Sequence, residues 1–206
     1  LVRPATTQVA QVQAPVPAAA SAPAPVAPVV TLAPRTLPSN TRTLGQATAP
    51  ELVEFADFQC PYCRKFSLGA ERQLEDALKQ GKLKFTYKYF PFLGQESFDA
   101  AYAAECANRQ GKFWEYADQL AIGWQGENAG SFTRDNLKKW AGLLKLDPAK
   151  FNACLDNQET KPVIDADIAE ARSLNVRGTP TFFVSGKLFN ALSLDSAMGW
   201  ATIWGG

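Results

Sequence analysis

A Cys-Pro-Tyr-Cys turn at residues 60–63 stands between a strand-like and a helix-like segment, and it constrains the fold more than any other feature. Residues 52–58 form a short, nearly continuous apolar run, which indicates a buried strand. Apolar residues then recur at helical spacing over 66–79, and Gly81 ends that helix. Over 82–89 the apolar period changes to two, which predicts a second strand. Two strands around a helix predict a β-α-β unit with parallel strands.

The rest of the chain predicts a helical block and then a return to β structure. Helices are expected over 98–109, over 113–122, from Thr133 to Leu144, after Asp147-Pro148, and over 163–174. Ser185-Gly186 lies between two apolar stretches and predicts a hairpin over 181–189. Residues 194–203 predict a closing amphipathic helix. The predicted fold class is therefore α/β.

The first 50 residues have a different composition from the rest of the chain. They contain no acidic residue, no aromatic residue and no cysteine, and alanine, proline, valine and threonine dominate. Such a segment cannot bury enough apolar surface to offset its ordering entropy, so residues 1–50 are expected to be a disordered, semi-rigid spacer. The spacer is either a tether or a low-complexity tail without consequence. Because the chain begins at Leu1, we expect that a preceding segment was removed.

Charge and composition exclude several classes of protein. The net charge is +1 and no basic cluster is present, so nucleic-acid binding has no electrostatic support. No apolar run reaches the length needed to span a membrane. Zinc sites usually need two close ligand pairs or added histidines, whereas this chain has four cysteines, a single close pair and no histidine. We therefore expect no metal and no cofactor.

The chemistry of the turn follows from its place between strand and helix. Cys60 would lie at the first helical turn, where unpaired backbone N–H groups and the helix dipole favour the thiolate. Pro61 suits this position because its missing N–H would have no helical partner. Cys63 would lie one turn further on, able to attack a mixed disulfide at Cys60. Cys60 is thus predicted as nucleophile and Cys63 as resolving thiol; the alternative is a buried structural pair.

Residues 51–205 resemble the DsbA-like oxidoreductases of the thioredoxin superfamily. The motifs that carry the resemblance are Glu54-Phe55, Phe58-Gln59-Cys60-Pro61-Tyr62-Cys63, Ala104-Glu105-Cys106, Phe113-Trp114, Gly178-Thr179-Pro180-Thr181-Phe182-Phe183-Val184 and Gly186-Lys187. The resemblance implies a thioredoxin fold with an inserted α-helical subdomain. One domain is expected over 51–206, with the insertion at about 95–160.

The resemblance also implies roles for residues away from the turn. The Thr179–Pro180 bond is expected to be cis and to face the redox pair, leaving the backbone of Thr179 to pair with an extended substrate chain. Glu54 matches the buried acid of the family, which relays a proton to or from Cys63; the alternative is a carboxylate at the rim of the sheet.

The two remaining cysteines, Cys106 and Cys154, both fall in the predicted helical block. The resemblance implies that they form a second, structural disulfide, which would indicate an oxidising compartment. The alternative is two buried free thiols that behave as small hydrophobic residues.

One residue departs from the strongly oxidising members of the family, which carry histidine before the second cysteine, where this chain has Tyr62. The residues between the cysteines tune the stability of the thiolate and so the reduction potential. The sequence therefore defines the reaction, thiol–disulfide exchange, better than the direction of electron flow. We predict a dithiol oxidase that introduces disulfides into exported proteins. The alternatives are a reductase or isomerase of the same fold, or a non-catalytic peptide-binding module.

The predicted oxidase implies partners and a location. Its partners would be the thiols of unfolded or folding proteins and a DsbB-like or VKOR-like membrane protein that reoxidises it. The protein is expected to be a monomer in the periplasm or cell envelope, tethered there through residues 1–50 if the spacer is an anchor. Cys-Pro-Tyr-Cys is also the glutaredoxin motif, but glutaredoxins lack a helical block of this kind.

Overall fold

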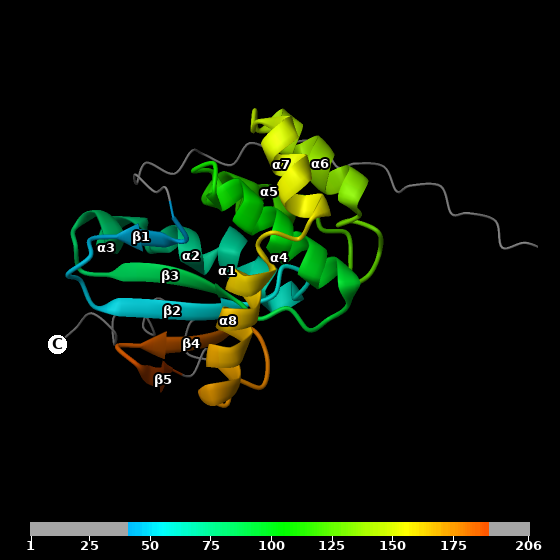
Figure 1. Ribbon diagram of the computed structural model, residues 1–206. Coiled ribbons are helices and arrows are strands. Elements are labelled where there is room, and N and C mark those ends of the chain that lie inside the picture. The colour runs from blue at the N-terminus through cyan, green and yellow to red at the C-terminus, as the bar shows by residue number, and fades with distance from the viewer. Residues whose placement is uncertain (1–40, 190–206) are drawn as a thin grey trace, which may run out of the picture.

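The computed structural model describes residues 41–189, which form a five-stranded mixed sheet with helices around it (Figure 1). The strands follow the order β1-β3-β2-β4-β5 across the sheet. The strands are β1 (Thr43–Gly45), β2 (Glu51–Ala56), β3 (Lys84–Tyr89), β4 (Thr181–Val184) and β5 (Lys187–Phe189). The helices are α1 (Pro61–Leu68), α2 (Ala70–Gln73), α3 (Glu75–Lys79), α4 (Gln95–Asn108), α5 (Phe113–Gly123), α6 (Arg134–Leu143), α7 (Pro148–Asp156) and α8 (Lys161–Ser173).

The centre of the sheet is the predicted β-α-β unit. Strands β2 and β3 are parallel, and α1 to α3 connect them. Strand β4 pairs with β2 in the antiparallel sense and continues into β5 through a hairpin. The turn residues Ser185 and Gly186 both have positive φ, at 46° and 78°, as a two-residue hairpin turn requires. The α/β class and the thioredoxin-type arrangement are therefore confirmed.

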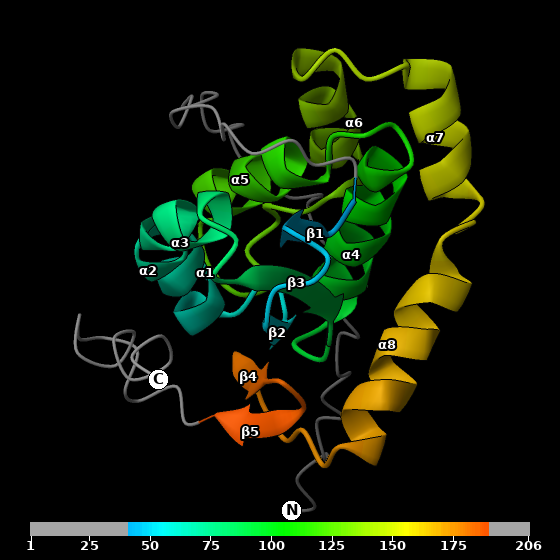
Figure 2. The same ribbon diagram turned by 90° about the vertical axis from the view of Figure 1, so that its left-hand side faces the viewer.

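Helices cover both faces of the sheet. Viewed along the strands, α1 to α3 lie on one face and α8 lies on the other (Figure 2). The first face carries the buried residues Leu52, Phe85 and Tyr89, which belong to the main core. On the other face Phe55 and Phe183 pack with Ala171 of α8. Helices α4 to α7 form the inserted block, and they lie beyond one end of the strands in Figure 1.

The long helix expected over 66–79 is interrupted. Gly69 adopts φ −120° and ψ −93°, which ends α1, and Leu74 separates α2 from α3. Glycine costs about 1 kcal/mol relative to alanine inside a helix and allows such a backbone conformation. The apolar spacing of the segment persists through the breaks, because Phe66, Leu74 and Leu78 all enter the same core.

The domain boundary expected after residue 50 is wrong, because β1 lies within the predicted spacer. Leu44 of β1 is fully buried and pairs with Phe85 of β3. Just before it, the Arg42 side chain forms ion pairs with Asp167 of α8 and with Glu105 of α4, the latter at 3.2 Å. A three-residue strand has no detectable period, and these ion pairs cross more than 60 residues of sequence, so local composition could not reveal them. Residues 1–40 and the helix expected over 194–203 lie outside the described residues.

Candidate active site

The turn that carries the two cysteines is fixed by its own backbone and by one carboxylate. Cys60 is the N-cap of α1, Pro61 follows at the first helical position, and the Cys60 N–H donates to the carbonyl of Asp57 at 2.9 Å. The Asp57 carboxylate accepts from the backbone N–H of Gln59 and of Phe92, both at 2.9 Å. Asp57 therefore holds the Cys60 turn against the segment that follows β3.

The helical block also holds this turn. The buried Gln59 side chain donates to the Ser97 hydroxyl of α4 at 3.0 Å. The backbone N–H of Asn128, in the loop after α5, donates to Oε1 of Gln59 at 2.6 Å. Sequence reasoning singled out neither Asp57 nor Asn128. The Asn128 contact spans 69 residues, and only the glycine-rich composition of its loop marks it in the sequence.

Hydrogen bonding lowers the pKa of Cys60 to about 6. The largest cause is a hydrogen bond from the Cys63 thiol; burial opposes it, and contacts with Thr179 and with the backbone N–H groups of Cys63 and Tyr62 add to the lowering. These N–H groups are the unpaired donors at the start of α1. The first helical turn thus stabilises the thiolate as expected for a nucleophile, whereas Tyr62 projects into solvent with 70% of its surface exposed.

Cys63 has the opposite electrostatic environment. Burial raises the pKa of the Cys63 thiol well above its usual range, and hydrogen bonding to Cys60 and the charge of Glu54 raise it further. Glu54 of β2 is itself buried, and its pKa is raised well above the usual range by burial, then by Glu71 and by Cys60. Glu54, Cys63 and Glu71 line one cavity of about 30 Å³. A carboxyl group with a raised pKa thus lies beside a thiol whose pKa is also raised.

The start of β4 brings the far end of the domain to the cysteines. The Thr179–Pro180 peptide bond is cis. In its thiol form Cys60 donates from Sγ to the carbonyl oxygen of Thr179 at 3.2 Å. The structure therefore assembles Glu54, Cys60, Cys63 and the Thr179–Pro180 bond at one place, although 119 residues separate Cys60 from Thr179.

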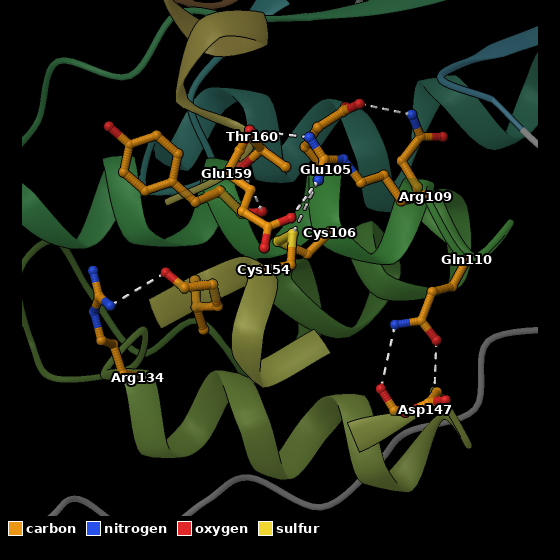
Figure 3. The surroundings of a disulfide bond; sticks show 12 residues. Glu105, Cys106, Arg109, Gln110, Arg134, Asp147, Cys154, Glu159 and Thr160 are labelled. Atoms are coloured by element: carbon orange, nitrogen blue, oxygen red, sulfur yellow. Dashed lines mark hydrogen bonds and ion pairs between the residues drawn. A yellow bond between two sulfur atoms is a disulfide. The ribbon is translucent and has the colours of Figure 1, made fainter. Parts of the chain in front are cut away.

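Cys106 and Cys154 form a disulfide outside this cluster. It joins α4 to α7, with 5.9 Å between the two Cα atoms (Figure 3). Beside it, Arg109 donates to the Glu159 carboxylate at 2.9 Å and to the Glu159 carbonyl at 3.0 Å. The bridge therefore ties together two helices of the inserted block.

Within residues 41–189 no group of three or more histidine, cysteine or acidic residues is placed to hold a metal ion. No helix in the same described range is long and apolar enough to cross a membrane.

Iodoacetamide alkylation of Cys60 in the reduced protein is expected to have its midpoint near pH 6, because only the thiolate reacts and the pKa of Cys60 is lowered to about 6. Because the pKa of Cys60 is lower in the folded protein than in the unfolded chain, the thiolate stabilises the folded, reduced protein. This contribution is fully present at pH values above the pKa of the unfolded chain. That contribution is lost as the pH falls through about 6. Mass spectrometry of the Cys60 peptide over a pH series checks this; a midpoint above about pH 8, as for an unperturbed thiol, would contradict it.

A redox-type Cys-x-x-Cys at the start of a helix, facing a cis-proline on this sheet, defines a thiol–disulfide oxidoreductase. The chain belongs to the thioredoxin family. The sequence model of that family, which carries the description thioredoxin, matches residues 38–200. It is a DsbA-like oxidoreductase of that family.

Curated relatives agree with this assignment, and solved structures share the fold. The chain is 32% identical over 158 residues to a probable disulfide bond formation protein D of Bacillus cereus, covering 74% of this chain and 73% of the relative. Oxidised BdbD from Bacillus subtilis superposes with a TM-score of 0.72 at 24% identity, over 82% of this chain and 97% of BdbD. A thioredoxin-like oxidoreductase from Silicibacter pomeroyi gives a TM-score of 0.62 at 28% identity, over 79% and 92% of the two chains.

Proposed function

We propose that this protein is a dithiol oxidase that transfers the Cys60–Cys63 disulfide to the thiols of folding exported proteins. The observation that carries the proposal is the stabilised Cys60 thiolate, with its pKa lowered to about 6. A thiolate that is stable at neutral pH favours the reduced form of the enzyme and so makes its disulfide a better oxidant. It is also a good leaving group when a second substrate thiolate attacks the mixed disulfide at Cys60.

The proposed reaction has two exchange steps. A substrate thiolate attacks Sγ of Cys60, the Cys60–Cys63 bond breaks, and Cys63 leaves as a thiolate that takes up a proton. A second substrate thiolate then attacks the substrate sulfur of the mixed disulfide and releases Cys60 as a thiolate. The substrate has lost two electrons and gained a disulfide, and the enzyme holds both electrons as a dithiol.

We assign Glu54 the proton transfers at Cys63. Burial raises its pKa well above the usual range, so the carboxyl group holds its proton more strongly than an exposed glutamate and can give it to the departing Cys63 thiolate. During reoxidation it takes that proton back, so that Cys63 can attack Cys60 and release the partner. Without such a group the high pKa of Cys63 would oppose the return step.

Substrate binding is assigned to the segment beside the cis-proline. Pro180 has no N–H, and Thr179 lies in contact with Cys60, so an extended substrate chain that pairs with the Thr179 backbone would present its cysteine to Cys60. Exposed Tyr62 provides an aromatic surface next to the same cysteine. Pro61 fixes the first helical turn that directs the backbone N–H groups toward Sγ.

The proposed oxidase needs an oxidising location and an electron acceptor. The Cys106–Cys154 disulfide supports an extracytoplasmic site, because structural disulfides persist in oxidising compartments. We propose a monomer in the periplasm or cell envelope that is reoxidised by a DsbB-like or VKOR-like membrane partner. The spacer at residues 1–40 would then act as a tether.

The reduction potential of the Cys60–Cys63 couple is the test of direction. Equilibration with glutathione buffers, followed by alkylation and mass spectrometry, is expected to give a value nearer the roughly −120 mV of a strong oxidant than the roughly −270 mV of thioredoxin. About 30 mV corresponds to a tenfold change in the equilibrium constant, so the two cases are well separated. A value near that of thioredoxin would favour a reductase of the same fold instead.

A further inference from the structure

Tyr87 is a buried tyrosine of β3 that faces the acid under the redox pair. It is the direct register partner of Glu54 in the parallel β2–β3 ladder, so both side chains point to the same face of the sheet. Its ring stacks on Phe58 with centroids 5.2 Å apart and contacts Tyr89 at 5.4 Å and Phe113 at 5.3 Å. Packing on several sides fixes the ring, and with it the position of the hydroxyl group.

Tyr87 lines the cavity shared by Glu54 and Cys63. Its hydroxyl is completely buried and has no hydrogen-bond partner among residues 41–189. A buried polar group without a protein partner calls for a water or a functional explanation. The cavity, at about 30 Å³, is large enough to hold a water molecule, which needs at least about 10–15 Å³ and two or more polar partners. The hydroxyl, the carboxyl group and the thiol provide such partners.

We propose that Tyr87 is a positioning residue for proton transfer at Cys63, donating a hydrogen bond through one water in this cavity to the Glu54 carboxylate. The inference rests on the proposed function, because it concerns the step in which Cys63 gives its proton to Glu54. In that step the Cys63 S–H bond breaks, the proton moves to Glu54, and the Cys63 thiolate attacks Sγ of Cys60. The bond from Cys60 to the partner sulfur breaks, and the partner leaves as a thiolate. The Tyr87 proton is not transferred; the hydroxyl only orients the water and the carboxyl group.

A tyrosine suits this position because it stays a neutral donor. Burial raises its pKa well above the usual range, and the charges of Glu54 and Cys63 raise it further. The other titratable groups at the cavity are Asp57, Arg64 and Glu71, and Tyr89 lies beside Tyr87 in β3. The Asp57 carboxylate accepts from the backbone N–H groups of Gln59 and Phe92, and the Arg64 guanidinium is directed to the carbonyl of Ala121 at 2.6 Å.

The test is Tyr87→Phe, which removes the hydroxyl and keeps the ring packing. The reduced protein is mixed with oxidised glutathione, and acid-quenched samples are analysed by mass spectrometry for the mixed disulfide at Cys60 and its resolution by Cys63. Loss of a donor to a charged group is expected to slow resolution about tenfold at pH 7. The pH midpoint of this step should rise by about one unit, since one pKa unit is a factor of ten. The alkylation midpoint of Cys60 should not move.

The matched control is Tyr116→Phe, at a tyrosine that is equally buried but donates to the carbonyl of Leu137 at 2.8 Å, outside the cavity. It should lower the melting temperature and leave the pH midpoint of resolution unchanged. The double variant Glu54→Gln/Tyr87→Phe should resolve at the rate of Glu54→Gln alone, because Tyr87 acts through Glu54. If the losses in resolution rate from Glu54→Gln and Tyr87→Phe were additive in the double variant, the proposal would be overturned.

An unchanged pH midpoint of resolution in Tyr87→Phe would also overturn the proposal. A slowing of resolution that Tyr116→Phe reproduces would do the same. A thioredoxin-like reduction potential in the wild type would refute the oxidase direction and leave this comparison intact, because resolution by Cys63 belongs to thiol–disulfide exchange in either direction.

Discussion

Cys63→Ser is expected to stop turnover and to accumulate a mixed disulfide at Cys60. The serine hydroxyl can replace the thiol as a hydrogen-bond donor to Cys60, which is the largest contribution to the lowered pKa of the nucleophile. Cys60 should therefore still attack a disulfide near neutral pH, but serine cannot displace the partner. Mixed with oxidised glutathione, nearly all of the variant should carry one glutathione, as shown by intact-mass measurement.

The matched control is Cys60→Ser. It retains a thiol at residue 63, but that thiol is buried and its pKa is well above the usual range, so little of it is ionised at neutral pH. The control should form almost no mixed disulfide and should show no turnover. If the two variants trapped glutathione equally, the assignment of Cys60 as nucleophile and Cys63 as resolving thiol would be wrong.

The turn and its fold class could be predicted because their causes are local. The change of apolar period from helical to alternating around residues 60–89 predicts the β-α-β unit, and a cysteine at the first helical turn acquires its thiolate from the adjacent backbone N–H groups. The hairpin was equally predictable, because Ser185-Gly186 supplies the positive φ values that the turn needs.

What sequence reasoning missed depends on contacts between distant segments. Arg42 looked like part of a spacer because its partners Glu105 and Asp167 lie in α4 and α8. The period of two over 82–89 places Tyr87 on the apolar face of a strand, and the structure buries it, but its relation to Glu54 depends on the register of β2 against β3. Register is a property of the folded sheet, so periodicity alone gives the face and not the neighbour.

Replacing both Cys106 and Cys154 with alanine is expected to lower the free energy of unfolding by about 4 kcal/mol, the entropic contribution of a bridge whose cysteines are 48 residues apart. Both residues are buried and join α4 to α7, so their loss should loosen the helical block first. Chemical denaturation of the oxidised variant and the oxidised wild type measures the difference. A loss below about 1 kcal/mol would mean that packing, not the bridge, holds the two helices together.

The same variant should keep its redox chemistry, for a reason visible in the fold. Ser97, which holds the Gln59 side chain next to Cys60, lies in the first turn of α4, whereas Cys106 lies in its last turn. Loosening the far end of α4 therefore leaves the support of the Cys60 turn in place. The reduction potential and the alkylation midpoint of Cys60 should match the wild type under conditions where the variant is folded. A shift of the midpoint by a full unit would mean that the bridge also positions the nucleophile.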